Sequence, residues 1–386
     1  MYSTEIHKGI TLLISLFYFI GIWHRGDRPT ARELKTKIFY SIYHPLFIIS
    51  IVVGGASGTK SIDAIIFLAE TSLAVAVLTI KFWLLIWKQN EIRVLLNRVC
   101  EFTIRNDDDY VTYNAKLKGF IKFVMIFLVA VIVNAVLVSL GVPIITSENS
   151  LFLEIGFPLD WKNSEAALGI ATIFILSELI LSAIAINFSV IIWYLLLTCS
   201  LRYDVMGSEL TNMGRASEET IENMTERDAH RNFFEELKAV IDAYRHLRDL
   251  TSELGSYFSN IIFVQFSTSG LCICGSVYCL AFDVGDSLLE SLIHIVMFFY
   301  FTSDLFMITY FGNEIMLSSD SLSYSLFESN WIEQPQSTKK CVIIFGEYVK
   351  QPQILLIAKL YPLTLETFTK IMNSAYSMFN ISKNFK

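Results

Sequence analysis

The sequence has few charged residues: Asp, Glu, Lys and Arg make up 17% of its 386 residues, whereas soluble globular domains carry about a quarter. The formal charge of −7 leaves no basic excess, which argues against a nucleic-acid partner because such proteins present a basic face. The P-loop, GxSxG and HExxH motifs of common enzyme classes are missing too. We therefore expect neither an enzyme nor a nucleic-acid-binding protein.

The sequence also lacks a disulfide framework and a metal-ligand pattern. Its six cysteines lie mostly in or beside apolar runs, where a thiol packs as a small hydrophobe. Cys272, Cys274 and Cys279 have no histidine or carboxylate at a zinc-ligand spacing. We expect no metal and no cofactor. Because no linker rich in Pro, Gly or Ser divides the chain, residues 1–386 are predicted to form one integrated domain.

Apolar residues are abundant, at 53% of the chain with a mean hydropathy of +0.50. A helix needs about 20 predominantly apolar residues to cross a bilayer. This predicts an all-α membrane protein with seven transmembrane helices. The predicted spans cover about 38–56, 62–87, 120–142, 167–199, 256–282, 288–311 and 363–382.

A further apolar run, residues 9–23, is short for a span and typical of a re-entrant or interfacial helix. A signal peptide is the alternative. Lys8 is the one firm positive charge before the run, and Trp23, His24 and Arg25 make a poor cleavage site. We favour a re-entrant helix within an N-terminal segment of residues 1–37.

Lys and Arg are distributed asymmetrically between the two sides of the predicted spans. They concentrate in 1–37, 88–122, 200–255 and 312–362, while the opposite side holds Lys60, Lys162, Lys383 and Lys386. Short loops rich in Lys and Arg face the cytoplasm. This predicts a cytoplasmic N-terminus and an extracellular C-terminus, the reverse of a G-protein-coupled receptor.

The predicted cytoplasmic segments contain helical patterns. In 228–258 apolar residues recur at helical spacing among charges, which predicts one amphipathic helix that runs into the fifth span. We expect cytoplasmic anchor helices at about 200–255 and 312–352. Apolar stripes in water must be buried, either in a self-contained bundle or by subunit assembly.

Two motifs carry a resemblance to a known family. The first is YFGNE followed by a tryptophan, and the second is YPLTLETF at residues 361–368. Together they resemble the C-terminal signature of insect odorant receptors, whereas 373–385 do not match the ending of gustatory receptors. The residues of the first motif, which the resemblance assigns to assembly and anchoring, are Tyr310, Phe311, Gly312, Asn313, Glu314 and Trp331.

The resemblance implies an odorant-gated, non-selective cation channel subunit in the plasma membrane of sensory neurons. It implies assembly with the odorant-receptor co-receptor in a heterotetramer, contact with membrane lipid, and a small volatile organic ligand. The pore is expected along the last span. A gustatory-type channel acting alone is the alternative, and a secondary transporter is a weaker one because neither repeated halves nor a break near the midplane is visible.

The predicted last span is polar for a lipid-facing helix. Polar groups in lipid are costly, so this face should meet protein or water; hydrogen bonding within one subunit is the alternative to a pore. Its polar residues are Thr364, Thr367, Thr369, Asn373, Ser374, Ser377 and Asn380, besides a Glu366 and Lys370 pair. The resemblance places the hydrophobic gate at Ile381 and Phe385 and the polar filter at Asn384, with Lys383 expected to face away.

The resemblance also places a ligand pocket in the extracellular half of the bundle. Aromatic and methionine side chains with a few polar groups suit a small volatile molecule, although ordinary helix packing would give the same pattern, and Glu178 could simply pair with another polar residue. The candidates are Phe67, Glu70, Thr71, Ala74, Asn134, Leu137, Val138, Phe174, Ser177, Glu178, Ser276, His294, Met297, Phe298 and Phe301.

Overall fold

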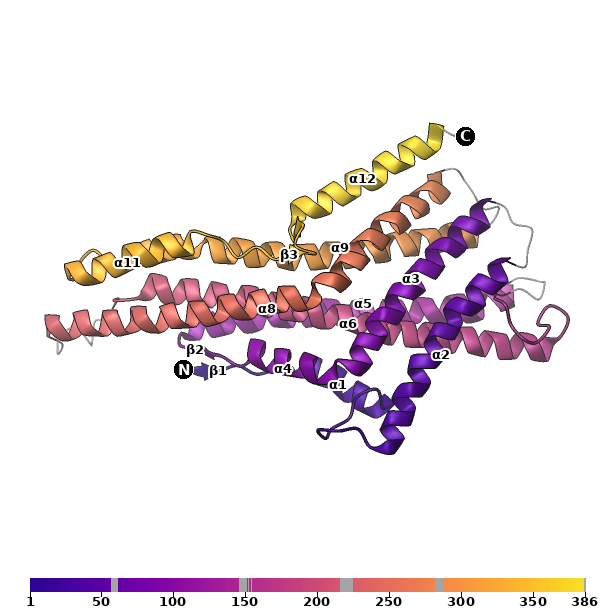
Figure 1. Ribbon diagram of the computed structural model, residues 1–386, viewed down its shortest axis with the longest axis horizontal. Helices are drawn as coiled ribbons and strands as arrows, with labels where there is room; N and C mark the ends of the chain where they lie inside the picture. The colour runs from indigo at the N-terminus through magenta and orange to yellow at the C-terminus, as the bar shows by residue number, and fades with distance from the viewer. Residues whose placement is uncertain are drawn as a thin grey trace.

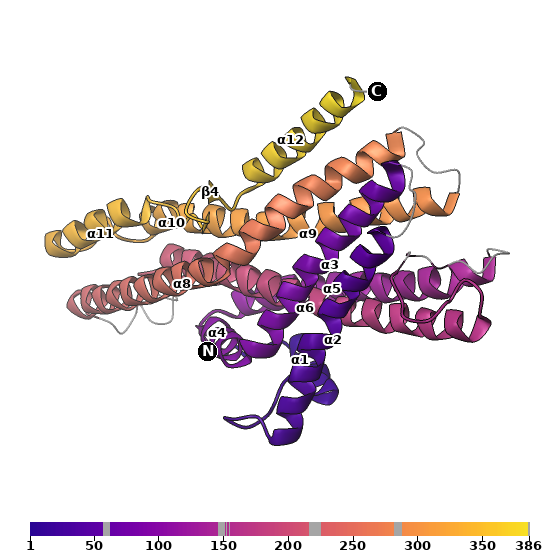
Figure 2. The same ribbon diagram turned by 45° about the vertical axis from the view of Figure 1, so that its right-hand side comes forward.

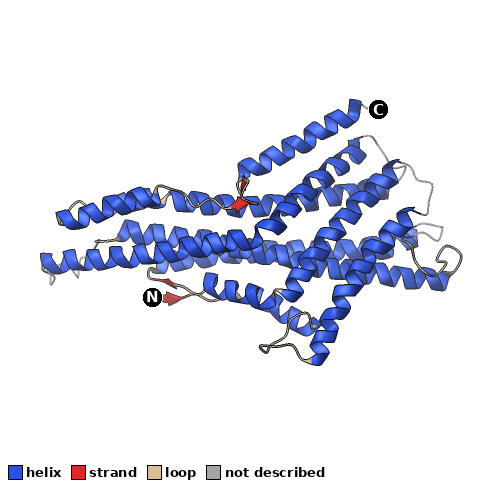
Figure 3. Ribbon diagram, viewed as in Figure 1, coloured by secondary structure: helices blue, strands red, loops and turns tan. Residues whose placement is uncertain are grey.

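The structure is a computed structural model that describes residues 1–56, 62–145, 151, 153, 155–215, 225–281 and 288–384. The helices dominate it (Figure 3), and they extend largely along one axis (Figure 1). The helices are α1 (Lys8–Ile20), α2 (Ala31–Ala56), α3 (Ile62–Trp87), α4 (Gln89–Cys100), α5 (Asp107–Ile145), α6 (Glu165–Asn212), α8 (Glu226–Ala281), α9 (Leu288–Asp320), α10 (Leu322–Glu328), α11 (Gln336–Val349) and α12 (Leu365–Asn384).

Two short antiparallel ribbons join pairs of segments. The first joins segments that are far apart in the sequence, and the second joins segments separated by a tight turn. The strand β1 (Tyr2–Ser3) pairs with β2 (Thr103–Ile104), which attaches the N-terminus to the segment after α4. The strand β3 (Leu356–Ile357) pairs with β4 (Tyr361–Pro362), directly before α12. The second ribbon therefore fixes the chain where it enters its last helix.

Six helices among the described residues are long and apolar enough to cross a membrane: α2, α3, α5, α6, α8 and α9. Their apolar parts cover the first six predicted spans, and several of them extend well past those spans. The predicted seventh segment is also helical, as α12, but its polar residues keep it below the hydropathy of the others. The structure thus contains the predicted helices, and α12 differs from the rest in composition.

The helix α6 lies at the centre of the molecule and contacts α2, α3, α4, α5, α8, α9 and α10. Every residue from 181 to 201 is buried. A helix that is apolar on all sides is stable only when protein or lipid surrounds it, and here protein does. The spans are therefore arranged around one central helix.

Beyond the bundle, the first half of α8 runs toward the left end of the molecule in Figure 1 and contacts α11, while α6 contacts α10. Tyr244 of α8 packs its ring edge-on against Phe345 and Tyr348 of α11, each at 5.7 Å between ring centroids. The end of α6 is fixed by Arg202, whose Nη1 donates to the last carbonyl oxygens of α4, those of Arg98 and Val99. The described residues of this extension, 200–215, 225–255 and 312–352, are called the anchor region below.

The helix α1 has one buried face and one exposed apolar face. Ile10 and Phe17 are buried, whereas Leu12, Leu16 and Phe19 form an exposed stripe at helical spacing. Gly21 ends the helix in a left-handed conformation, with φ of 83°, which glycine adopts without strain. The exposed stripe suits contact with lipid.

Candidate functional site

Three polar clusters hold most of the ionisable side chains buried among the spans. In the first, Glu70 of α3 meets Ser276 of α8 and His294 of α9. Ser276 Oγ donates to Glu70 Oε2 at 3.4 Å, and His294 Nδ1 lies 3.7 Å from the same oxygen. Phe67 stands edge-on to the His294 ring at 5.5 Å between centroids. The structure thus brings four predicted ligand-binding residues, from three helices, to one place.

Bonding in this first cluster is incomplete. Both contacts to Glu70 Oε2 are longer than an ordinary hydrogen bond of about 2.8–3.0 Å. Within the described part of the chain, neither Glu70 Oε1 nor His294 Nδ1 has a hydrogen-bond partner, although both atoms are buried. A buried polar atom without a partner costs about 1–3 kcal/mol. The cluster therefore has capacity for a further polar group.

Gly275 explains how an acid fits against α8. A Cβ at position 275 would overlap the carboxylate of Glu70, so a larger residue there would push the acid away. The bare backbone at Gly275 leaves the carboxylate room beside Ser276. The position of Glu70 is thus set by a glycine that the sequence analysis did not select.

The second cluster joins α2 to α6 and contains three other candidates. Glu178 Oε2 lies 2.8 Å from His44 Nδ1, and both side chains are fully buried. The hydroxyls of Ser177 and Tyr43 are hydrogen-bonded at 2.7 Å, and the Phe174 ring also packs edge-on against Tyr43. These candidates therefore contact α2, and Glu178 has the polar partner that the alternative interpretation expected.

The third cluster is an ion pair that the sequence analysis did not select. Lys81 Nζ of α3 donates to Asp304 Oδ2 of α9 at 2.9 Å and to Ser189 Oγ of α6 at 2.8 Å. The exposed fractions of the Lys81 and Asp304 side chains are 1% and 5%. The sequence did contain a signal for this pair, because an ionisable residue inside a membrane span is a functional candidate. The same signal applies to His44.

The remaining pocket candidates are dispersed. Thr71 and Ala74 are buried on α3, Phe301 is buried on α9, and Met297 and Phe298 are half-buried. On α5, Asn134 is half-buried and Leu137 is 64% exposed on the outside of the bundle, so Leu137 does not join the cluster. The side chain of Val138 lies outside the described residues.

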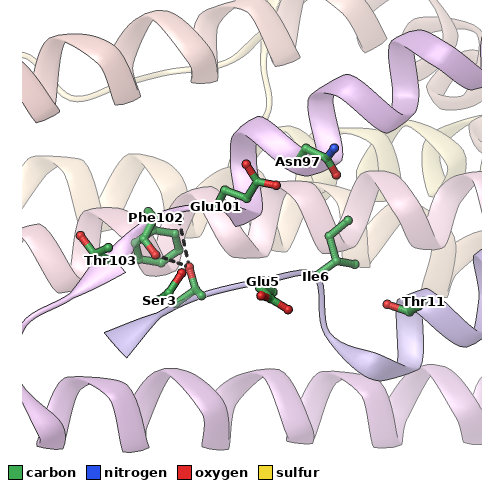
Figure 4. A pocket seen from close by; sticks show the side chains of 9 residues that line it. Ser3, Glu5, Ile6, Thr11, Asn97, Glu101, Phe102 and Thr103 are labelled. Atoms are coloured by element: carbon green, nitrogen blue, oxygen red, sulfur yellow. Dashed lines mark hydrogen bonds between the residues drawn. The ribbon is translucent and has the colours of Figure 1, made fainter. Parts of the chain in front are cut away.

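A separate hollow of about 550 Å³ lies at the N-terminal end of the chain (Figure 4). It is open to the surface, and no candidate ligand-binding residue lines it. Its lining comes from β1, the start of α1, the end of α4 and β2: Ser3, Thr4, Glu5, Ile6, Thr11, Asn97, Glu101, Phe102 and Thr103.

The helix α12 contacts α8 and α9 and projects away from the bundle in both views (Figures 1 and 2). Its exposed side is largely polar, and Glu366 and Lys370 form an exposed ion pair at 2.7 Å. The exposed polar residues are Glu366, Thr369, Lys370, Asn373, Ser374 and Ser377. This polar stripe, as it is called below, is turned away from the rest of the chain.

Two threonines depart from the predicted polar face. Thr364 and Thr367 are buried, because the first turn of α12 packs on the chain that precedes it and Thr367 Oγ1 donates to the carbonyl of Pro362 at 2.6 Å. Asn380 is half-buried. Of the gate and filter positions, Ile381 is exposed, the side chain of Asn384 is not described, and Phe385 lies outside the described residues.

The residues of the first motif make contacts around the end of α9. Phe311 packs edge-on against Phe120 of α5, and Glu314 is half-buried. Trp331 donates from its indole nitrogen to the Phe327 carbonyl at 3.2 Å. Tyr310 stacks on Phe306, Gly312 lies against Leu363, directly before α12, and Asn313 accepts from the N–H of Leu365.

Comparison with known proteins identifies the relatives of this chain. A family model described as 7tm Odorant receptor matches residues 62–376. Among Drosophila melanogaster proteins, odorant receptor 23a is 28% identical over 239 residues, 61% of this chain and 59% of that protein. Odorant receptor 94a is 22% identical over 339 residues, 85% of this chain and 82% of that protein.

The fold also matches solved structures. The insect olfactory receptor OR5 from Machilis hrabei has a TM-score of 0.80 at 14% identity, covering 98% of this chain and 100% of that one. The same receptor in complex with eugenol has a TM-score of 0.73 at 13% identity, with the same coverage. At these identities the likeness shows the fold.

Proposed function

The chain belongs to the 7tm odorant receptor family, and on this premise we propose that it is a subunit of an odorant-gated, non-selective cation channel. It is a multi-pass membrane protein with the seven-span, all-α fold of insect odorant receptors. The proposal concerns what this fold does: a small volatile ligand binds among the spans, and a pore bordered by α12 opens.

The polar stripe of α12 is the observation that carries the pore proposal. The stripe is exposed along a helix that belongs to the transmembrane fold, and polar side chains facing lipid are costly. Among the described residues, α12 contacts α8 and α9 on its other side. The stripe would be stabilised by water in a pore and by neighbouring subunits.

Assembly and orientation belong to the same proposal. The Lys and Arg distribution supports a cytoplasmic N-terminus and anchor region and an extracellular C-terminus. The anchor region exposes large apolar side chains, among them Tyr324, Ile332 and Ile344. Such side chains favour burial against other subunits, so we infer a heterotetramer with the odorant-receptor co-receptor in the plasma membrane, formed by residues 1–386 as one membrane domain.

For the ligand, the first cluster is the best-supported contact. Glu70 and His294 offer polar atoms with unused bonding capacity beside the aromatic ring of Phe67. A mostly apolar surrounding with a few polar groups is typical of small-molecule sites. An odorant carrying a hydroxyl or another hydrogen-bonding group would meet both requirements.

Expression with and without the co-receptor tests the channel proposal. We expect little odour-evoked current from this chain alone, and a non-selective cation current, insensitive to G-protein block, when the co-receptor is added. A robust current from the chain alone would favour a gustatory-type channel. Saturable uptake of a substrate without conductance would favour a transporter.

Substitutions at the gate positions test the pore proposal. Hydrophobic constrictions gate by losing water, so Ile381→Ala and Phe385→Ala should each change the basal current. Unchanged basal and evoked currents in both variants would remove these positions from the gate.

A further inference from the structure

The chain enters α12 through a contact in which two motifs, separated by about fifty residues of sequence, lie against each other. Residues 310–313 belong to the last turns of α9, and residues 363–368 lead into α12. The rings of Phe306 and Phe368 meet edge-on at 5.6 Å between centroids, and Phe306 also stacks on Tyr310. We call the contact between these segments the α9–α12 junction.

Gly312 makes the closest approach at the junction. A Cβ at this position would lie 2.5 Å from the carbonyl oxygen of Leu363 and would overlap the Leu363 side chain. The side chain of Leu363 is buried, with 2% of it exposed. Because one of the two obstacles is backbone, an added methyl group could be accommodated only by moving the chain that enters α12.

Hydrogen bonds hold the same segment in place. Leu363 N–H donates to the carbonyl of Leu355 at 2.8 Å. The Asn313 amide oxygen lies 3.5 Å from the N–H of Leu365, one of the unpaired donors at the start of α12. In the turn before β4, the N–H of Ala358 donates to Ser259 Oγ of α8 at 2.6 Å. The entrance to α12 is therefore attached to both α8 and α9.

Farther along, the contacts of α12 become sparser. Ala375 is its one fully buried residue between 369 and 381, and Ile371 lies over Gly270 of α8. Both views show α12 leaving the line of α9 and rising in nearly the same direction as the second half of α8, which it contacts (Figures 1 and 2). The helix is thus held firmly at its base and loosely along its length.

We propose that the α9–α12 junction is the pivot of α12: Gly312 and Asn313 are positioning residues that set where the helix starts and the angle at which it leaves the bundle. This inference rests on the proposed function, in which α12 borders the pore.

The helix α9 links this pivot to the first polar cluster. His294 and Gly312 lie on the same uninterrupted helix, separated by about 27 Å at 1.5 Å per residue. A ligand that displaces His294 would move α9, and through Gly312 the base of α12. Ligand binding and pore geometry would then be coupled by one rigid element.

Gly312→Ala, expressed with the co-receptor, tests the pivot. We expect the variant to reach the membrane and to shift the basal current, or the odorant concentration for half-maximal current, by about fivefold or more, the usual range of coupling between sites. The matched control is Gly119→Ala on α5, because a Cβ there meets no described atom within 4 Å. That control should behave as the parent does.

Asn313 provides a second test, which does not depend on a steric clash. Asn313→Asp keeps an oxygen acceptor for the Leu365 N–H and should keep gating near the parent, whereas Asn313→Leu removes it and should shift gating in the same direction as Gly312→Ala. Rescue by the conservative variant separates positioning from general damage.

Several outcomes would overturn the pivot. One is a parent-like basal current and half-maximal concentration in Gly312→Ala and Asn313→Leu at normal surface level. Another is loss of surface protein in all junction variants while Gly119→Ala is normal, since the junction would then serve folding alone. If the parent chain with the co-receptor gives no odour-evoked current, it is the proposed function that fails.

Discussion

The helices α6 and α12 belong to the same bundle and deal with polar residues in opposite ways. The buried stretch of α6, residues 181–201, is enclosed by other helices of the chain, and its Ser189 is hydrogen-bonded to Lys81. The polar stripe of α12 faces outward. The polar residues of this α6 stretch are therefore enclosed by protein. In α12, Thr369 and Ser374 donate to backbone carbonyls of their own helix and Glu366 pairs with Lys370. The stripe they form still presents its surface outward, where polar groups in a membrane are costly unless they meet protein or water.

The first polar cluster is intermediate between these extremes. Glu70 and His294 are as buried as the polar residues of α6, but the contacts to Glu70 Oε2, at 3.4 and 3.7 Å, are longer than those of Lys81, at 2.8 and 2.9 Å. Under the proposed function we assign three roles: short ion pairs such as that of Lys81 and Asp304 stabilise the bundle, the Glu70 cluster accepts a ligand, and α12 borders the pore.

The largest effect is expected from breaking the buried ion pair of Lys81 and Asp304. Asp304→Ala leaves the Lys81 ammonium buried and unpaired, which should lower the free energy of unfolding by about 3–5 kcal/mol. Thermal unfolding in detergent and surface level should both fall. The double variant Lys81→Met with Asp304→Leu should recover much of the loss. A double variant as unstable as Asp304→Ala would contradict the assignment of this pair to stability.

A cavity in α6 should cost somewhat less. Leu195 is fully buried, and a buried Leu→Ala change typically costs about 2–5 kcal/mol. The matched control is Leu137→Ala on α5, which removes the same atoms from an exposed position. Equal losses of thermal stability in the two variants would show that α6 is not more tightly packed than the outer surface.

The Glu70 cluster should affect ligand choice more than stability. Glu70→Gln removes the charge, and a hydrogen bond to a charged group contributes about 1.5–3 kcal/mol, or about tenfold or more in potency. An alcohol odorant should lose this potency while its methyl ether, of nearly the same shape, loses little. Identical losses for both odorants would remove Glu70 from ligand recognition.

The sequence alone predicts the helices well because span length and apolar composition decide them. The α8 helix follows directly from the stripe in 228–258. Side-chain partners follow less directly: Glu178 pairs with His44, and Lys81 pairs with Asp304, across helices whose relative rotation no periodicity fixes. The buried Thr364 and Thr367 illustrate the same limit, because Thr364 precedes α12 and Thr367 donates to the Pro362 carbonyl of β4.

The contact between Gly312 and Leu363 could not be predicted from the sequence either. The motifs could be recognised, but the backbone approach that requires a glycine appears only once α9 and the entrance to α12 are placed in space.

The smallest effect on stability is expected for substitutions in the polar stripe. The same substitutions also test most directly whether α12 borders the pore. Asn373→Cys should leave folding nearly unchanged, since exposed substitutions usually alter stability by less than about 0.5 kcal/mol. With the co-receptor present, a charged thiol reagent should then inhibit the odour-evoked current. Ala375→Cys, on the buried side of the same helix, should resist the reagent, as should the parent chain. Equal modification of the two variants, or no change in current after Asn373→Cys has reacted, would contradict the claim that the polar stripe of α12 borders the pore.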